Sequence, residues 1–188
     1  MKTLVCFGDS ITAGKEGHKE SLLTSLLSKQ LVDFKIINSG VPGDNTNQAL
    51  DRLKNDVLVY KPDLVTVLFG ANDAALHKTV ELEVFKENIR KITTSIGSNR
   101  TILISPAPVD EELQKARTNI ILSKYADAVR EVSIETESHF IDLFGYILSK
   151  DQYQTILKGL DNDGLHFGEL GYEILSQLIV QKITELQN

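Results

Sequence analysis

Short, almost continuous apolar runs recur along this chain and are separated by longer stretches of mixed polarity. The runs cover residues 3–7, 33–37, 64–69, 101–104 and 139–142. Runs of this length are typical of parallel strands whose two faces are both covered by helices. The pattern therefore predicts five strands.

The stretches between these runs carry apolar residues three and four positions apart. This spacing places the side chains on one face and is typical of amphipathic helices. It predicts helices over 15–31, from an N-cap at Thr46 to about residue 57, over 82–96, over about 111–136 and through the C-terminal segment to Leu186, with shorter helical patches at 143–148 and 153–157. The stretch 82–96 is the most regular and is followed by Gly97, a natural helix stop.

Strands that alternate with helices favour an α/β fold, in which a parallel sheet has helices on both faces. In such sheets, ligands bind beyond the carboxyl ends of the strands. Ser10 and the segments 38–45, 70–73 and 105–109 follow predicted strands directly, so we expect them to share one rim of the sheet. No repeat, low-complexity segment or linker divides the chain, and we expect a single domain over residues 1–188.

Composition narrows the class of partner. The net charge is −6 and the basic residues are scattered, which argues against nucleic acid because phosphate binding needs a basic face. No apolar run approaches the ~18 residues of a membrane span. The N-terminal apolar run is too short for a signal peptide, and the single cysteine, Cys6, is expected to be a buried thiol. These features predict a cytoplasmic protein.

Ser10 is the candidate nucleophile. It lies in Gly8-Asp9-Ser10, directly after the first predicted strand, where a rigid strand end would present its hydroxyl to a crevice. Alone, this tripeptide is common in turns, and most such serines merely cap a turn or a helix. The catalytic interpretation therefore depends on partners elsewhere in the chain.

His166 is the best candidate for a general base among the four histidines. His139 is expected at the opposite end of a strand from the rim, His18 has no carboxylate placed to orient it, and the neighbours of His77 indicate a helix entry. Asp163 precedes His166 by three residues, a spacing that lets one turn bring the carboxylate to Nδ1 while Nε2 faces outward. Taken alone, Asp163 also fits a turn residue.

Donors for an oxyanion are available in other loops. The backbone N–H of Gly43 is approachable because glycine has no side chain, and Asn72 offers a side-chain amide. The N–H of Ser10 would be the third donor. Taken singly, Gly43 also fits a turn glycine and Asn72 a helix-capping residue, but four segments with complementary roles on one rim are an improbable coincidence.

The sequence resembles the GDSL, or SGNH, hydrolases, whose four blocks occur in order. They match Gly8–Thr12, Asn38–Asp44, Gly70–Asp73 and Asp163–His166, and the family's donor glycine falls on Gly43. Ile11 replaces the leucine of the name-giving motif, a common apolar exchange. The resemblance implies a flavodoxin-like three-layer α/β/α sandwich and serine esterase or lipase chemistry without a cofactor or metal. Segments 69–74, 106–111 and 163–167 also resemble the isoamyl acetate-hydrolysing esterase branch.

These observations together predict a serine esterase that acts through Ser10, His166 and Asp163 and an acyl-enzyme intermediate. We expect a small-molecule ester as substrate, with small acyl or acetyl esters and acetylated sugars favoured, because no long insertion offers a lid. A lysophospholipase or acyl-thioesterase is an alternative within the family. From other classes, a non-catalytic flavodoxin-like binding module or an interaction domain with a decayed site remains open, as does the oligomeric state.

Overall fold

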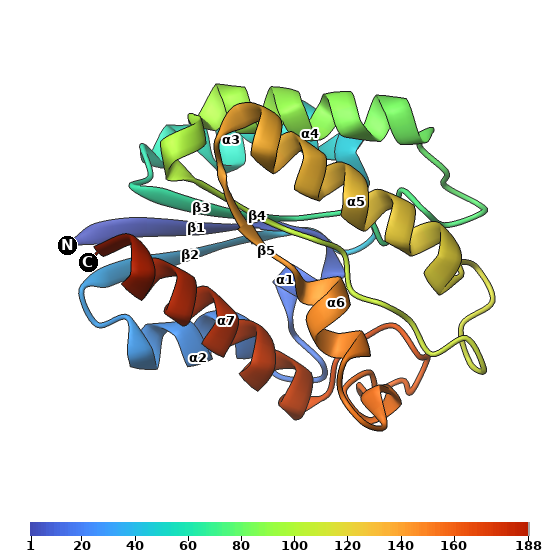
Figure 1. Cartoon of the computed structure of the whole chain (residues 1–188). Helices are drawn as coiled ribbons and strands as arrows, with labels where there is room; N and C mark the ends of the chain where they lie inside the picture. The colour runs from blue at the N-terminus through green and yellow to red at the C-terminus, as the bar shows by residue number, and fades with distance from the viewer. Residues whose placement is uncertain (188) are drawn as a thin grey trace.

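The computed structural model describes residues 1–187; Asn188, the last residue of the expected domain, lies outside them. Five parallel strands form one sheet in the order β2-β1-β3-β4-β5 (Figure 1). The strands are β1 (Lys2–Gly8), β2 (Phe34–Gly40), β3 (Leu64–Leu68), β4 (Thr101–Ile104) and β5 (His139–Ile141). The five predicted strands and their parallel arrangement are thereby confirmed.

Helices cover both faces of the sheet. The helices are α1 (Ser10–Ala13), α2 (Leu22–Gln30), α3 (Thr46–Asp56), α4 (Leu82–Ile96), α5 (Asn119–Thr136), α6 (Leu143–Leu148) and α7 (Glu169–Gln187). In Figure 1, α3, α4 and α5 lie above the sheet, and α2 and α7 lie below it. The expected three-layer α/β/α sandwich is confirmed. Every helix within residues 1–187 is too short or too polar to cross a membrane.

The side chains of each strand pack alternately into two apolar cores, because successive side chains of a strand point to opposite faces of the sheet. Val5 and Phe7 of β1 pack under α3–α5, whereas Leu4 and Cys6 pack against α2 and α7. This two-sided burial is why the runs in the sequence are continuous. Cys6 is a free thiol, and its burial raises its pKa to about 12.

The helix predicted over 15–31 is wrong in its first part. Residues 15–20 form a loop, and α2 starts only after Ser21, whose Oγ accepts a hydrogen bond from the N–H of Thr24. Glu16 and Gly17 have φ values of 36° and 77°, which a right-handed helix does not allow. The same loop contacts the far segment of the chain, because the N–H of Leu160 donates to Glu16 Oε2 at 3.0 Å.

The helix predicted over 111–136 is also wrong at its start. Its first third is a loop, and α5 begins at Asn119 after an N-cap at Thr118. The side chain of Asn119 both accepts from the N–H and donates to the carbonyl oxygen of Val109, at 2.8 and 2.9 Å, which folds the loop back on itself. Leu113, which lies within the range predicted as helix, is 45% exposed.

Smaller differences concern element ends. Asn45, rather than Thr46, is the N-cap of α3, and Gln48 completes a capping box with it. The patch at 143–148 is helical as predicted, but within 153–157 only a short 3₁₀ turn forms at Tyr153–Thr155. In β2, pairing with β1 extends to Gly40, so the strand runs further than predicted.

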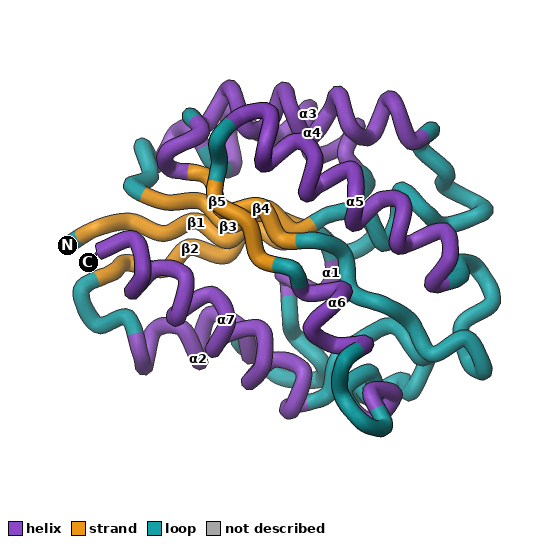
Figure 2. Tube along the Cα trace, in the orientation of Figure 1, coloured by secondary structure: helices purple, strands orange, loops and turns teal. Residues whose placement is uncertain are grey.

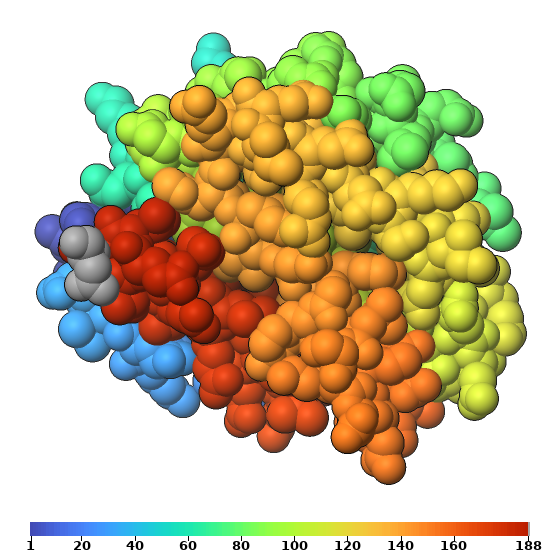
Figure 3. All heavy atoms as spheres, viewed as in Figure 1, coloured from blue at the N-terminus to red at the C-terminus, as the bar shows by residue number. Residues whose placement is uncertain are grey.

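The carboxyl ends of the strands point to the right in Figure 1, where α1, α6 and the longest loops gather. Figure 2 shows that this end of the molecule consists mostly of loops. In Figure 3, the segments from α5 to α7 make up most of the visible surface. His139 is the first residue of β5 and so lies at the opposite end of the sheet, as predicted.

Candidate active site

Ser10 is the first residue of α1 and is separated from the end of β1 by Asp9 alone. Asp9 caps this short helix, because its Oδ1 accepts from the N–H of Ile11 at 3.0 Å. Gly8 has to be glycine: a Cβ there would lie 2.1 Å from Thr12 Oγ1 and 2.6 Å from the carbonyl oxygen of Leu68. The tight strand-to-helix turn therefore fixes the position of the Ser10 hydroxyl.

His166 reaches Ser10 from the other end of the chain. Its Nε2 lies 2.9 Å from Ser10 Oγ, and its Nδ1 lies 2.8 Å from Asp163 Oδ2. Within residues 1–187, no other histidine forms a hydrogen bond with Ser10. The structure thus brings the predicted nucleophile, base and orienting carboxylate into one continuous hydrogen-bonded line.

Asp163 is held by its own turn. Its Oδ1 accepts from the N–H groups of Leu165 and His166 at 2.9 and 3.0 Å. Burial raises the pKa of Asp163, but these N–H groups and the neighbouring His166 outweigh burial, so the pKa is lowered overall. Asp163 is therefore ionised at neutral pH and suited to hold an imidazolium.

The predicted oxyanion donors lie in the loops after β1, β2 and β3. Gly43 has a φ of 83°, and neither its N–H nor that of Ser10 donates to an acceptor within residues 1–187. Asn72 differs, because its Nδ2 donates to the carbonyl oxygen of Asp44 at 3.0 Å and approaches Asp9 Oδ2 at 3.4 Å. Asn72 thus links the loops that carry Gly43 and Ser10.

Comparison with known families bears on this site directly. The model of the GDSL-like lipase/acylhydrolase family matches residues 6–174. The chain belongs to this family. The predicted enzyme class, a GDSL-type esterase or lipase, is confirmed with it.

Individual relatives of this GDSL-family chain agree. The human isoamyl acetate-hydrolyzing esterase 1 homolog is 30% identical, over 97% of this chain and 83% of that protein. A lipase/acylhydrolase from Enterococcus faecalis has a similar structure, with a TM-score of 0.92 and 35% identity over 98% of this chain and 96% of that one. An acetylxylan esterase from Geobacillus stearothermophilus, with a TM-score of 0.77, 21% identity and coverage of 97% and 94%, shares the fold.

Arg52 is a residue of the GDSL-family site that the motifs did not reveal. Its guanidinium pairs with Asp44 at 2.5 Å and donates to the carbonyl oxygens of Ser39 and Gly8 at 2.8 and 2.9 Å. It therefore joins the ends of β1 and β2 to the loop that carries Gly43. The only sequence signal was a charged residue on α3 that follows Asp44 by two helical turns.

Two buried carboxyl groups lie behind the loops of the GDSL blocks. Burial raises the pKa of Asp9 to about 7 and that of Asp73 to about 6. Asp73 Oδ1 accepts from the N–H and the hydroxyl of Thr46 at 2.8 and 2.6 Å, which anchors the start of α3. Asp9 and Asp73 therefore both form hydrogen bonds that stabilise the loops around Ser10.

Ser10 and His166 line an open cleft of about 230 Å³. The other lining residues are Ala13, Lys15, Glu16, Gly17, Pro42, Leu160 and Asp161. The loop 15–20, predicted as helix, thus supplies one wall, and the loop before the Asp163–His166 turn supplies Leu160 and Asp161. Residues 1–187 contain no group of three or more His, Cys, Asp or Glu side chains placed to hold a metal ion.

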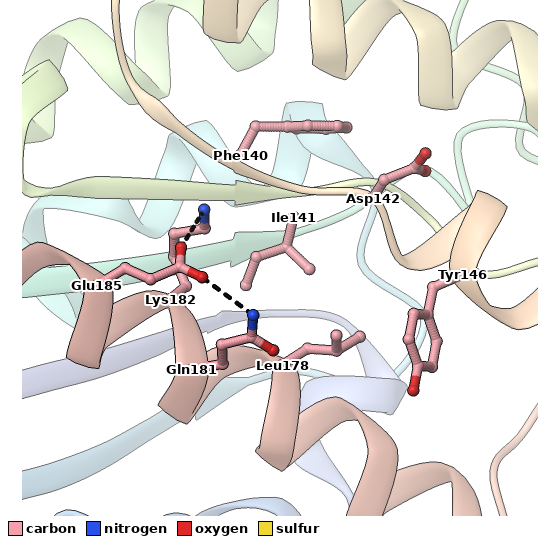
Figure 4. A pocket seen from close by; sticks show the side chains of 8 residues that line it. All are labelled: Phe140, Ile141, Asp142, Tyr146, Leu178, Gln181, Lys182 and Glu185. Carbon is pink, nitrogen blue, oxygen red and sulfur yellow. Dashed lines mark hydrogen bonds and ion pairs between the residues drawn. The ribbon is translucent and has the colours of Figure 1, made fainter.

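A second groove, of about 240 Å³, lies beside the edge strand β5, between α6 and α7 (Figure 4). Three of its polar side chains form hydrogen bonds with one another: Glu185 accepts from Lys182 at 2.8 Å and from Gln181 at 3.0 Å. None of the predicted site residues lines it. We therefore place the chemistry in the Ser10 cleft.

Proposed function

We propose that this GDSL-family chain hydrolyses small carboxylic esters through an acyl-enzyme on Ser10. The observation that carries the proposal is the line from Ser10 Oγ to His166 Nε2, at 2.9 Å, and from His166 Nδ1 to Asp163, at 2.8 Å. A hydroxyl, a base and an orienting carboxylate in this arrangement are what serine acyl transfer requires.

The reaction has two steps. Ser10 Oγ attacks the ester carbonyl while His166 Nε2 takes the hydroxyl proton, and Asp163 stabilises the resulting imidazolium. His166 then returns the proton to the departing alcohol, which leaves the acyl group on Ser10. In the second step, His166 takes a proton from water, the hydroxide attacks the acyl carbonyl, and the proton returns to Ser10 as the carboxylic acid leaves.

The tetrahedral oxyanion is stabilised by three donors in this proposal. The free N–H groups of Ser10 and Gly43 are two of them. Asn72 supplies the third by exchanging its weak 3.4 Å contact with Asp9 for the oxyanion, while its 3.0 Å bond to Asp44 keeps the amide in place. Donors fixed before the reaction begins need no reorganisation as the charge develops.

Small esters fit the cleft better than bulky ones. Its volume of about 230 Å³ accommodates a short acyl group with a modest alcohol. The human relative is named for hydrolysis of isoamyl acetate, a small ester. We extend the proposal to one catalytic domain over residues 1–188. The family match covers residues 6–174, and the site loops are all connected to strands of a single sheet.

The test is a comparison of p-nitrophenyl acetate hydrolysis by the wild-type protein, Ser10→Ala and Ser123→Ala. Ser123 is a half-buried serine on α5, outside the cleft, and serves as the matched control. We expect Ser10→Ala to lose activity to near background and Ser123→Ala to retain it. Equal activity of wild type and Ser10→Ala, or no hydrolysis by wild type of any p-nitrophenyl ester from acetate to decanoate, would reject the proposal.

A further inference from the structure

Arg117 is a buried cation that no carboxylate neutralises by direct contact. The residue is 4% exposed, and its Nε donates to no acceptor within residues 1–187. Its guanidinium forms no ion pair within those residues, and burial lowers its pKa. A buried charge without a partner is costly, so such groups are normally paired or bind a ligand.

The other four arginines of the chain each have a hydrogen-bonding or ionic partner. Arg52, Arg90 and Arg130 each pair with at least one carboxylate, and Arg100 donates to backbone carbonyl oxygens. All four are more exposed than Arg117 and could have been left to water at lower cost. Arg117 is therefore the exception within residues 1–187.

Arg117 borders the candidate active site. Burial lowers the pKa of Arg117, and the carboxylates of Asp9 and Asp163, which flank Ser10 and His166, are near enough to raise it in part. It belongs to the loop between β4 and α5, which is tied to the His166 turn by the N–H of Asp110 donating to the carbonyl oxygen of Gly164 at 2.8 Å. The neighbouring Ala116 accepts from the N–H of Leu76 at 2.9 Å. The backbone around Arg117 is thus held where the loops that carry His166 and Asn72 meet.

Asp9 and Asp163 have other partners already. Asp9 accepts from the N–H of Ile11 and contacts Asn72, and Asp163 uses both oxygens for His166 and its own turn. The donors of Arg117 consequently remain free. A guanidinium presents its N–H groups as a planar fork that matches a carboxylate.

We propose that Arg117 binds a carboxylate group carried by the ester substrate. The inference rests on the proposed hydrolase function and narrows its substrate class to esters with an anionic end. The carboxylate completes the missing ion pair of Arg117 when the scissile carbonyl reaches Ser10. Lys78, whose Nζ donates to the carbonyl oxygen of Gly43 at 2.9 Å, adds a second positive charge at the same rim.

The experiment compares kcat/KM for two pairs of esters that differ in charge and little in shape. Mono-p-nitrophenyl glutarate and its amide, p-nitrophenyl glutaramate, place the charge in the acyl group. The pair 4-acetoxybenzoate and 4-acetoxybenzamide places it in the leaving alcohol. The pair that shows a preference therefore identifies the side of the ester that meets Arg117.

We expect wild type to prefer the carboxylate in one pair by about 10-fold or more, the range of a charge-assisted hydrogen bond. Arg117→Gln should abolish this preference through a higher KM, with hydrolysis of the neutral ester kept within a few-fold. Arg117→Lys should keep part of the preference because it keeps the charge. Arg130→Gln, which removes an exposed arginine paired with Asp142, is the matched control and should keep all of it.

Two results overturn the inference when Arg117→Gln folds. One is the absence of any preference for the carboxylate in both pairs with the wild-type protein, which needs no variant. The other is an equal loss on charged and neutral esters in Arg117→Gln, which would indicate electrostatic support of Asp9 or Asp163. If Arg117→Gln does not fold, an unchanged preference in Arg117→Lys overturns it too. Hydrolysis of the neutral esters by wild type and not by Ser10→Ala tests the hydrolase function separately.

Discussion

Asp163 holds His166 with one carboxylate oxygen, 2.8 Å from Nδ1, and holds the backbone of the same turn with the other. The proposed orienting acid and the proposed base therefore belong to one hydrogen-bonded turn of four residues. The three-residue spacing permits this contact, and the two backbone hydrogen bonds to Asp163 fix the turn that makes it. For catalysis, this turn must also lie beside Ser10. The sheet topology brings the two together.

Asp163→Asn tests the orienting role. The amide keeps the shape but cannot stabilise an imidazolium, so we expect kcat to fall on the order of 10³–10⁴-fold, the range known for such triads. Steady-state kinetics on p-nitrophenyl acetate measures it. Asp51→Asn, an exposed change on α3, should be indistinguishable from wild type. A loss below about 10-fold in Asp163→Asn would contradict the assigned role.

Gly43→Ala separates backbone strain from catalysis. Gly43 has a φ of 83°, and a Cβ would lie 3.1 Å from Lys78 Nζ, so we expect a cost of about 1 kcal/mol in unfolding free energy. The shifted N–H should also lower kcat. Gly97→Ala, at a φ of 105° after α4, carries a comparable strain away from the cleft. Denaturant unfolding and kinetics on both variants should show equal destabilisation with activity lost only in Gly43→Ala.

Asn72→Ala removes one oxyanion donor. We expect kcat to fall on the order of 10²–10³-fold with little change in KM, because the oxyanion forms only in the transition state. Asn88→Ala is the control: its buried amide donates to Thr46 and Asn47, so the variant loses comparable hydrogen bonds. Both variants should melt earlier than wild type. If both also lose kcat equally, the donor role of Asn72 is rejected.

Asp9 makes the stability of the protein depend on pH. Its pKa rises from 3.8 to about 7 because it is buried. The native state therefore holds a proton that the unfolded state releases, and wild type loses stability as pH rises from about 4 to about 7. Asp9→Asn removes this titration.

Between pH 5 and pH 8, the unfolding free energy of Asp9→Asn should therefore rise by roughly 3 kcal/mol relative to that of wild type. Asp73, with a pKa of about 6, titrates in both proteins and enters the difference only through its coupling to Asp9, whose pKa its charge raises less than burial does. Urea unfolding at a series of pH values measures the change. A difference that stays constant across this range would show that Asp9 is ionised in the native state throughout.

The sheet and the proximity of Ser10, Asp163 and His166 were predictable from the sequence because local signals indicated them. Two-sided burial makes the strands continuous apolar runs, as in Val65–Leu68 of β3. Parallel topology then gathers every loop that follows a strand at one edge. Gly43 and Asn72 came from such loops, and the structure places both beside the Ser10 turn.

Residues positioned by contacts between distant loops left no such signal. The loop at 15–20 adopts positive φ values and packs on Leu160, which the leucine spacing further along could not indicate. The same holds for Arg117, because no periodicity shows that a polar loop will bury an arginine. Arg52 looked like an ordinary surface charge on α3 until Asp44 and the ends of two strands were found around it.

Active-site labelling with a fluorophosphonate tests the central claim, that Ser10 is the nucleophile, most directly. Intact mass spectrometry and peptide mapping should find one adduct per chain, on Ser10. The adduct should be absent from Ser10→Ala, strongly slowed in His166→Ala and unchanged in Ser123→Ala. An adduct on another residue, or full labelling of Ser10→Ala, would contradict the account.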